Sequence, residues 1–168
     1  MIKNLIMRQF TLLLTSLLFA CSSRGQQISN TMSIENEIKK SDAEWKASLT
    51  PAQYNVCRLK GTEAPGSGKY DKFYEKGYYR CVACGSWLFD SDTKYDSGSG
   101  WPSFFDAHDN TTLSFHQDSS YGIVRTEVTC AKCGSHLGHL FNDGPQPTGM
   151  RYCINSLALE FVSDKNKE

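Results

Sequence analysis

The sequence predicts a mainly β domain of the α+β type, in which short helices precede a series of antiparallel strands. Two observations support this prediction. After residue 70, apolar and polar residues alternate in short runs, and turn-forming residues separate these runs. No strong helical period occurs after residue 58, whereas two helix-start patterns lie before it. A chain of 168 residues accommodates one such domain with appended segments.

Residues 1–20 have the pattern of an export signal. Lys3 and Arg8 give a positive start, and the apolar run over residues 10–20 is too short for a permanent transmembrane helix. The run ends in Leu-Phe-Ala-Cys, which resembles the bacterial lipobox, with Cys21 as the acylated residue. We therefore predict export and a lipid anchor on Cys21 without a membrane-spanning helix. An ordinary cleaved signal is the alternative.

Residues 21–40 are predicted to form the lipidated N-terminus and a flexible tether, because they are polar and contain no aromatic side chain. Their last residues, 34–40, alternatively begin a helix. Ser22 does not resemble an inner-membrane retention signal. We therefore expect the anchored chain on the periplasmic side of the outer membrane.

Two capping-box patterns predict the helices. Ser41 with Glu44 opens a short first helix, and Thr50 with Gln53 opens a second one, which also has proline at its first helical position. The second helix is expected to end at about residue 58, and a loop containing Gly and Pro follows it.

The strands are predicted from period-two alternation, and the domain is expected to span residues 41–163 with a polar tail at 164–168. The expected strands are residues 78–82, 86–89, 112–116, 123–129, 136–141, 151–155 and 157–162.

Two CxxCG motifs predict a metal site. Cys81 and Cys84 form the first pair, and Cys130 and Cys133 form the second. Two such knuckles make a tetrahedral Cys₄ zinc site with no open position, so the zinc would be structural. The 45 residues between Cys84 and Cys130 imply that the ion joins distant strands. Disulfides, a redox-active CxxC pair and, more weakly, iron are the alternatives.

The last strands contain a cysteine outside these pairs. Alternation places Arg151, Cys153 and Asn155 on one face of an extended segment. A thiol beside a guanidinium is favoured as thiolate, which is the nucleophilic form. We therefore predict that Cys153 is the reactive residue; a merely buried thiol is the alternative.

Three stretches, together with the CxxC pairs, resemble the B-type methionine sulfoxide reductases over about residues 42–161. They are Lys-Tyr-Asp-Ser-Gly-Ser-Gly-Trp-Pro-Ser-Phe at 94–104, Cys-Gly-Ser-His-Leu-Gly-His-Leu-Phe at 133–141, and residues 143–155. The resemblance implies two antiparallel sheets with N-terminal helices, often with a Cys₄ zinc. It further implies reduction of the R epimer of methionine sulfoxide in proteins or peptides, and a thioredoxin-like reductant.

The resemblance also implies the roles of the site residues. Cys153 would attack the sulfoxide sulfur and become a sulfenic acid. His139, or a water that it orders, would supply the proton, and His136 would help to orient that water. Asn155 would line the site. The substrate-binding side chains would be Trp101, whose indole packs on the substrate methyl group, and Phe141.

Each of these roles has a plainer alternative. The two histidines could be hydrogen-bonded core residues or zinc ligands. Trp101 could belong to the core. Arg151 could form only a surface ion pair rather than act on the Cys153 thiol.

One position departs from the family pattern. Many members carry a resolving cysteine in the Gly-Cys-Gly-Trp-Pro loop, where this chain has Ser99. Serine cannot convert a sulfenic acid to a disulfide. Some members use a cysteine in the N-terminal region instead, and Cys57 lies there. We predict that Cys57 resolves Cys153; a buried structural thiol or direct reduction by an external thiol is the alternative.

Two other functional classes compete with a reductase. A zinc-containing module that binds nucleic acid or protein is disfavoured by the export signal and by charge, because 18 Lys+Arg balance 18 Asp+Glu and no basic stripe occurs. We therefore expect no nucleic-acid partner. A thioredoxin-like disulfide oxidoreductase would require a βαβ pattern, which is missing.

Overall fold

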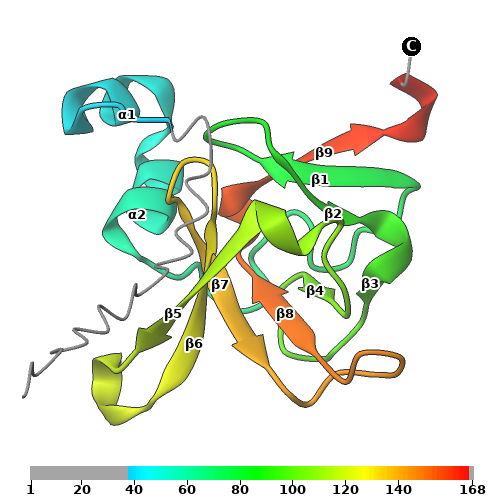
Figure 1. Cartoon of the computed structure of the whole chain (residues 1–168). Coiled ribbons are helices and arrows are strands. Elements are labelled where there is room, and N and C mark those ends of the chain that lie inside the picture. Colours follow the sequence, from blue (N-terminus) through cyan, green and yellow to red (C-terminus); the bar gives the residue numbers. More distant parts are fainter. Residues whose placement is uncertain (1–37, 167–168) are drawn as a thin grey trace, which may run out of the picture. The chain divides into compact units, whose positions relative to one another are not determined.

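A computed structural model describes residues 38–166 as two helices followed by two antiparallel sheets (Figure 1). The predicted fold class is confirmed. The predicted export signal, Cys21 and most of the predicted tether lie outside the described residues. Within residues 38–166, no helix has both the length and the apolar character that crossing a membrane requires.

The two helices begin where the capping patterns predict. They are α1 (Asp42–Ser48) and α2 (Pro51–Leu59), and both N-caps form the reciprocal capping box with the side chain three residues later. Lys60 ends α2 in a left-handed conformation, with φ of 58°. Trp45 is buried and fixes α1 against α2, because the Arg58 guanidinium lies 4.8 Å from the centre of its ring.

The smaller sheet has the strand order β2-β1-β9. These strands are β1 (Gly77–Cys81), β2 (Trp87–Asp90) and β9 (Leu159–Ser163), all antiparallel. The last strand begins two residues later than predicted, because residues Ser156–Ala158 form a 3₁₀ turn.

The larger sheet has the order β3-β4-β8-β7-β6-β5. Its strands are β3 (Lys94–Tyr95), β4 (Ser103–Phe104), β5 (Leu113–Asp118), β6 (Arg125–Cys130), β7 (His136–Phe141) and β8 (Arg151–Ile154). The strand that carries the predicted nucleophile, β8, therefore lies inside the sheet between β4 and β7, where both of its edges are paired (Figure 1).

Aromatic side chains join the two sheets. Tyr79 on β1 and Phe89 on β2 are fully buried, and both pack on Phe104 of β4, with ring centres 5.1 Å and 4.4 Å away. Large aromatic rings bury much apolar area and prefer such edge and offset contacts. The aromatic core between the two sheets therefore packs against β4, the strand next to β8.

Candidate active site around Cys153

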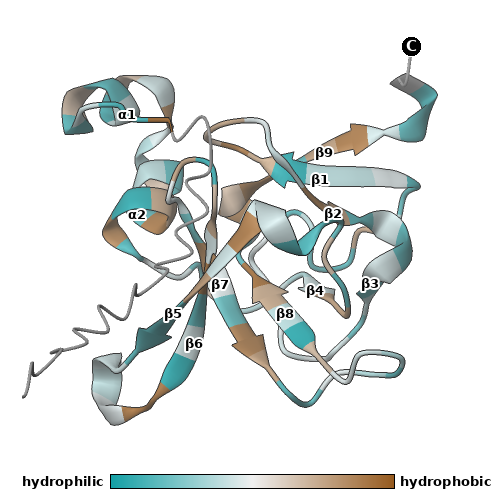
Figure 2. Cartoon of the chain, in the orientation of Figure 1, coloured by the Kyte–Doolittle hydropathy of each residue, from teal (hydrophilic) through white to brown (hydrophobic). Residues whose placement is uncertain are grey.

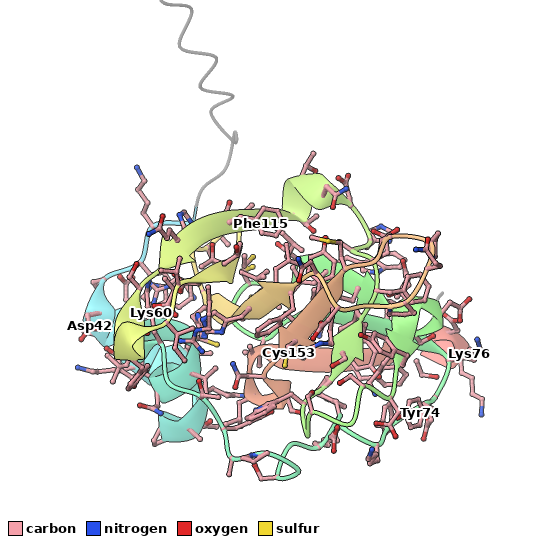
Figure 3. All side chains as sticks on the ribbon, turned by 90° about the horizontal axis from the view of Figure 1, so that it is seen from below. Asp42, Lys60, Tyr74, Lys76, Phe115 and Cys153 are labelled. Atoms are coloured by element: carbon pink, nitrogen blue, oxygen red, sulfur yellow. The ribbon has the colours of Figure 1, made fainter. Side chains whose placement is uncertain are left out.

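Cys153 opens into a pocket of about 110 Å³. Its walls come from β6, β7, β8 and two loops, and are formed by Thr62, Trp101, Arg125, Gly138, His139, Phe141, Cys153 and Asn155. Five residues predicted for the active site are therefore brought together, although they are far apart in the sequence. Figure 3 shows the Cys153 side chain within the fold, on β8.

The alternation predicted for β8 holds over the strand. Tyr152 and Ile154 are buried, whereas Arg151 and Cys153 are half-buried. On the neighbouring strand, His139 is the cross-strand partner of Cys153. Gly138 permits this close pairing, because a Cβ atom there would lie 2.0 Å from the carbonyl oxygen of Cys153.

The Cys153 thiol is less acidic than an arginine neighbour alone would make it. Burial raises the pKa of Cys153, and the Ser99 hydroxyl and the Arg151 guanidinium lower it only partly. The Arg151 guanidinium donates two hydrogen bonds to Asp143, at 2.7 Å and 2.9 Å, and lies 4.2 Å from the centre of the Phe141 ring. Burial therefore disfavours the thiolate form expected for Cys153. The Arg151 guanidinium, which favours that form, is at the same time paired with the Asp143 carboxylate.

Ser99 lies next to Cys153, the predicted nucleophile. Its Oγ atom is 3.8 Å from Sγ of Cys153, and Ser97 Oγ holds Ser99 Oγ at 2.8 Å. The position that carries a resolving cysteine in many family members is therefore in reach of Cys153 but has only a hydroxyl group.

The two histidines differ in their relation to the pocket. His139 lines it, and its Nε2 atom is 2.8 Å from Oδ2 of Asp118, which also accepts a hydrogen bond of 2.7 Å from Arg125. A carboxylate partner fixes the orientation of an imidazole ring. His139 is thus held in place at the wall of the Cys153 pocket.

His136 lies outside this pocket. It is 3% exposed, and its Nδ1 atom is 2.8 Å from Oε1 of Glu127, whose other oxygen pairs with Lys60 at 2.7 Å. Its ring centre is 5.5 Å from that of His139. Burial lowers the pKa of His136. His136 is thus a neighbour of His139 but is not among the residues that line the Cys153 pocket.

Glu63, which sequence reasoning missed, ties the pocket walls together. Its carbonyl oxygen accepts a hydrogen bond from the Trp101 indole at 3.1 Å, and its amide donates to Oδ1 of Asn155 at 3.1 Å. Its carboxylate accepts from the amides of Ser156 and Leu157 at 2.6 Å and 3.0 Å. Asn155 also donates to the Leu137 carbonyl. The side-chain amide of Asn155 is thus held by hydrogen bonds to the backbone of Glu63 and Leu137.

Asp118, Glu127, Arg125 and Thr62 were also missed by the sequence reasoning. Asp118 and Glu127 belong to no motif and stand on alternating strands like ordinary surface residues. Glu127 lies in the expected strand 123–129 and Asp118 lies outside the expected strand 112–116, so no sequence pattern placed either carboxylate beside a histidine.

Cys57 is not among the residues that line the pocket. It is 2% exposed, on the part of α2 that packs against β7, and burial raises the pKa of its thiol to about 12. Cys133 is the next largest influence on that pKa.

The four CxxCG cysteines converge as predicted. The ligand atoms of Cys81, Cys84, Cys130 and Cys133 all lie within 4.8 Å of one another. All six cysteines among the described residues are free, so no CxxC pair is a disulfide there. Gly85 and Gly134 occupy left-handed conformations and donate to the carbonyls of Cys81 and Cys130, both at 2.8 Å. This donor set fits a tetrahedral Zn²⁺ ion.

Comparisons with known proteins agree with the geometry. A sequence profile of the SelR domain matches residues 49–163. The peptide methionine sulfoxide reductase MsrB of Pseudomonas syringae is 58% identical over 127 residues, which are 76% of this chain and 97% of the relative. The MsrB of Leptospira interrogans is 57% identical over 128 residues, 76% of this chain and 98% of the relative. The MsrB of Methanosarcina mazei is 54% identical over 132 residues, which are 79% of this chain and 94% of the relative. The chain therefore belongs to the MsrB family of peptide methionine sulfoxide reductases.

Proposed function

We propose that this chain reduces the R epimer of methionine sulfoxide in oxidised proteins or peptides, with Cys153 as nucleophile. The observation that carries the proposal is the pocket of about 110 Å³ in which the Cys153 thiol, the Trp101 indole and the His139 imidazole meet. A reductase of a sulfoxide needs a soft nucleophile for sulfur, a flat apolar wall for the methyl group and a proton for the oxygen. These three groups supply them.

The chemical step transfers one oxygen atom. Cys153 sulfur attacks the sulfoxide sulfur, the oxygen passes to Cys153 as a sulfenic acid, and methionine leaves. The substrate sulfur gains two electrons, which the Cys153 sulfur loses. The thiol proton must leave as attack begins, because the thiolate is the nucleophile. His139, held by Asp118, is the proposed carrier of this proton to the sulfoxide oxygen.

The proposed substrate contacts follow from the fixed walls. Trp101 is held by its indole N–H on the Glu63 carbonyl, so its ring presents a constant face to the pocket. Phe141 forms another wall and is itself covered by the Arg151 guanidinium. Aromatic faces suit the methyl group of a sulfoxide, whose sulfur is positively polarised.

The deciding experiment compares the R and S epimers of N-acetyl-methionine sulfoxide with dithiothreitol as reductant. We expect turnover of the R epimer alone, and its loss in Cys153→Ser. Cys57→Ser serves as the matched cysteine control, because an external dithiol makes a second protein thiol dispensable. Equal turnover of both epimers would contradict the proposal.

Regeneration of Cys153 is proposed to proceed through Cys57 and a thioredoxin-like reductant. Within residues 38–166, Cys57 is the one cysteine besides Cys153 that stands outside the four-cysteine cluster. Its thiol would attack the sulfenic sulfur, forming the disulfide and releasing water. Mass spectrometry after one turnover without reductant tests this. A Cys57–Cys153 disulfide is expected, and a persistent dimedone adduct on Cys153 would exclude this route.

We also propose that the four-cysteine cluster holds one structural zinc ion, and that the chain is exported and lipid-anchored through Cys21. The zinc proposal is supported by the converging sulfur atoms. The anchor is supported by the lipobox pattern in the sequence. If the anchor is correct, globomycin should make an unprocessed precursor accumulate in the bacterial host. Normal maturation in the presence of the drug would disprove it.

A further inference from the structure

The Cys153 pocket is small. Its volume is about 110 Å³. A polypeptide that carries methionine sulfoxide must therefore lie outside the pocket and send only the oxidised side chain into it. The adjoining surface decides which polypeptides can do so.

A second recess continues directly from this pocket. It has a volume of about 480 Å³ and shares three wall residues with the pocket, namely Thr62, Arg125 and His139. It lies between the end of α2 and the 3₁₀ turn at Ser120–Gly122, which joins β5 to β6. Figure 3 shows Lys60, which lines this recess, and Cys153 on the underside of the fold.

Two exposed apolar side chains stand at this recess, one from each side. Leu59 at the end of α2 is 62% exposed, and Tyr121 in the turn is 92% exposed. Hydrophobic colouring marks the end of α2 (Figure 2). Tyr121 also has a left-handed backbone, with φ of 56°, which is unfavourable for a bulky residue. A strained turn thus holds an aromatic side chain out in solvent beside the active site.

The charged groups of the recess are already paired. Lys60 contacts Glu127 at 2.7 Å, and Arg125 contacts Asp118 at 2.7 Å. Two cations therefore balance two carboxylates, and the recess has no charge excess that would attract an acidic or a basic segment. We therefore expect the recess to discriminate among polypeptides by apolar contact with Leu59 and Tyr121 rather than by charge.

A larger groove is less suited to this role. It has a volume of about 880 Å³ and shares Arg125 and Phe141, but not His139, with the Cys153 pocket. It is also lined by Leu140 and Met150. Leu140 pairs with Tyr152, whereas His139 pairs with Cys153. Because side chains alternate across a strand, Leu140 points to the opposite face of the sheet from His139.

We propose that Leu59 and Tyr121, at the recess beside the Cys153 pocket, contact an apolar side chain that flanks methionine sulfoxide in the substrate polypeptide. This inference rests on the proposed reductase function and adds two specificity-determining residues to it. Methionine is most often buried among apolar residues, so apolar segments are a frequent location of its oxidation product.

The test compares two substrates with the double variant Leu59→Gln and Tyr121→Asn. Glutamine keeps helix propensity at the end of α2, and asparagine tolerates the positive φ. For a pentapeptide with leucine on both sides of the sulfoxide, we expect KM to rise about tenfold, as loss of partial apolar burial implies. For the N-acetyl-methionine sulfoxide amide, which has no flanking residue, we expect KM and kcat to stay unchanged.

Two controls match the variant. Tyr74→Asn removes another exposed tyrosine, and Val124→Asn changes the larger groove; neither residue lines the recess. Unchanged pentapeptide KM in the double variant, or an equal loss with Val124→Asn, would overturn the inference. Fluorescence anisotropy of the labelled pentapeptide on the Cys153→Ser background gives the same comparison as Kd values. That readout decides the inference even if wild-type turnover disproves the proposed function.

Discussion

At the scale of single residues, the reactivity proposed for Cys153 depends on opposing effects on one thiol. Burial in the pocket raises its pKa, while the Ser99 hydroxyl and the Arg151 guanidinium lower it without restoring the usual value. At neutral pH the residue therefore rests as a thiol. This protects it from unwanted oxidation, since susceptibility follows thiolate character and exposure. It also means that a proton must move in every turnover, which gives His139 its proposed role.

The contribution of Arg151 can be isolated by Arg151→Gln. Because the guanidinium lowers the pKa of Cys153, its loss should raise that pKa further and move the thiolate to higher pH. We expect the pH profile of Cys153 alkylation by iodoacetamide to shift toward alkaline pH, and activity at neutral pH to fall several-fold. Arg80→Gln is the matched control, because Arg80 forms a similar two-bond pair with Glu160 on the smaller sheet. An unshifted pH profile of alkylation would show that pairing with Asp143 cancels the effect of the Arg151 guanidinium on the pKa of Cys153.

Ser99→Cys should supply the resolving thiol that this loop lacks. The Ser99 Oγ atom is already 3.8 Å from Sγ of Cys153, so a small adjustment brings two sulfur atoms to bonding distance. After one turnover without reductant, we expect a disulfide between position 99 and Cys153 in place of one that includes Cys57. Peptide mapping by mass spectrometry measures this. Ser97→Cys, in the same loop, should not give the disulfide, and a sulfenic acid that persists in Ser99→Cys would refute the expectation.

At the scale of elements, the sequence predicted what local patterns encode. Two capping boxes and seven alternating runs correspond to α1, α2 and seven of the nine described strands. The two-residue strands β3 and β4 were not predictable, because two residues carry no alternation; they exist through pairing with β8. Glu63, Asp118 and Glu127 were missed for a related reason. Their roles come from contacts between distant segments, and no spacing in the chain encodes those contacts.

The capping box of α2 can be tested by Thr50→Val against Thr50→Ser. Threonine accepts a hydrogen bond from the backbone of Gln53, which valine cannot do and serine can. We expect Thr50→Val to lower the free energy of unfolding by about 1 kcal/mol, and Thr50→Ser to lie close to the wild type. Urea unfolding followed by circular dichroism measures both. A loss in Thr50→Ser but not in Thr50→Val would point to packing of the threonine methyl group rather than to the cap, because valine keeps that methyl group and serine lacks it.

At the scale of the whole molecule, the four-cysteine cluster and the aromatic core lie at different places between the two sheets. Cys81 and Cys84 belong to β1 and the turn after it, in the smaller sheet, whereas Cys130 and Cys133 belong to the β6–β7 connection in the larger one. The β6–β7 turn leads directly into the strand of His136 and His139. An ion at the cluster would therefore fix the position of the histidine strand relative to the smaller sheet without touching the chemistry.

Removal of the metal should accordingly lower the stability of the fold, and it should affect the Cys153 thiol only through that loss of stability. Ligand binding to the native state adds directly to the free energy of unfolding, and structural zinc contributes about 10–16 kcal/mol in small domains. We expect about one zinc per chain by elemental analysis, and a large drop in the thermal midpoint on chelation under reducing conditions. Cys84→Ser should lose the zinc and show the same drop. Cys57→Ser should keep both the ion and a midpoint nearer the wild type, because Cys57 is a buried thiol outside the four-ligand set. A Cys84→Ser variant that retains one zinc and the wild-type midpoint would mean that the cluster does not join the sheets through a metal, and that the aromatic contacts of Tyr79, Phe89 and Phe104 suffice.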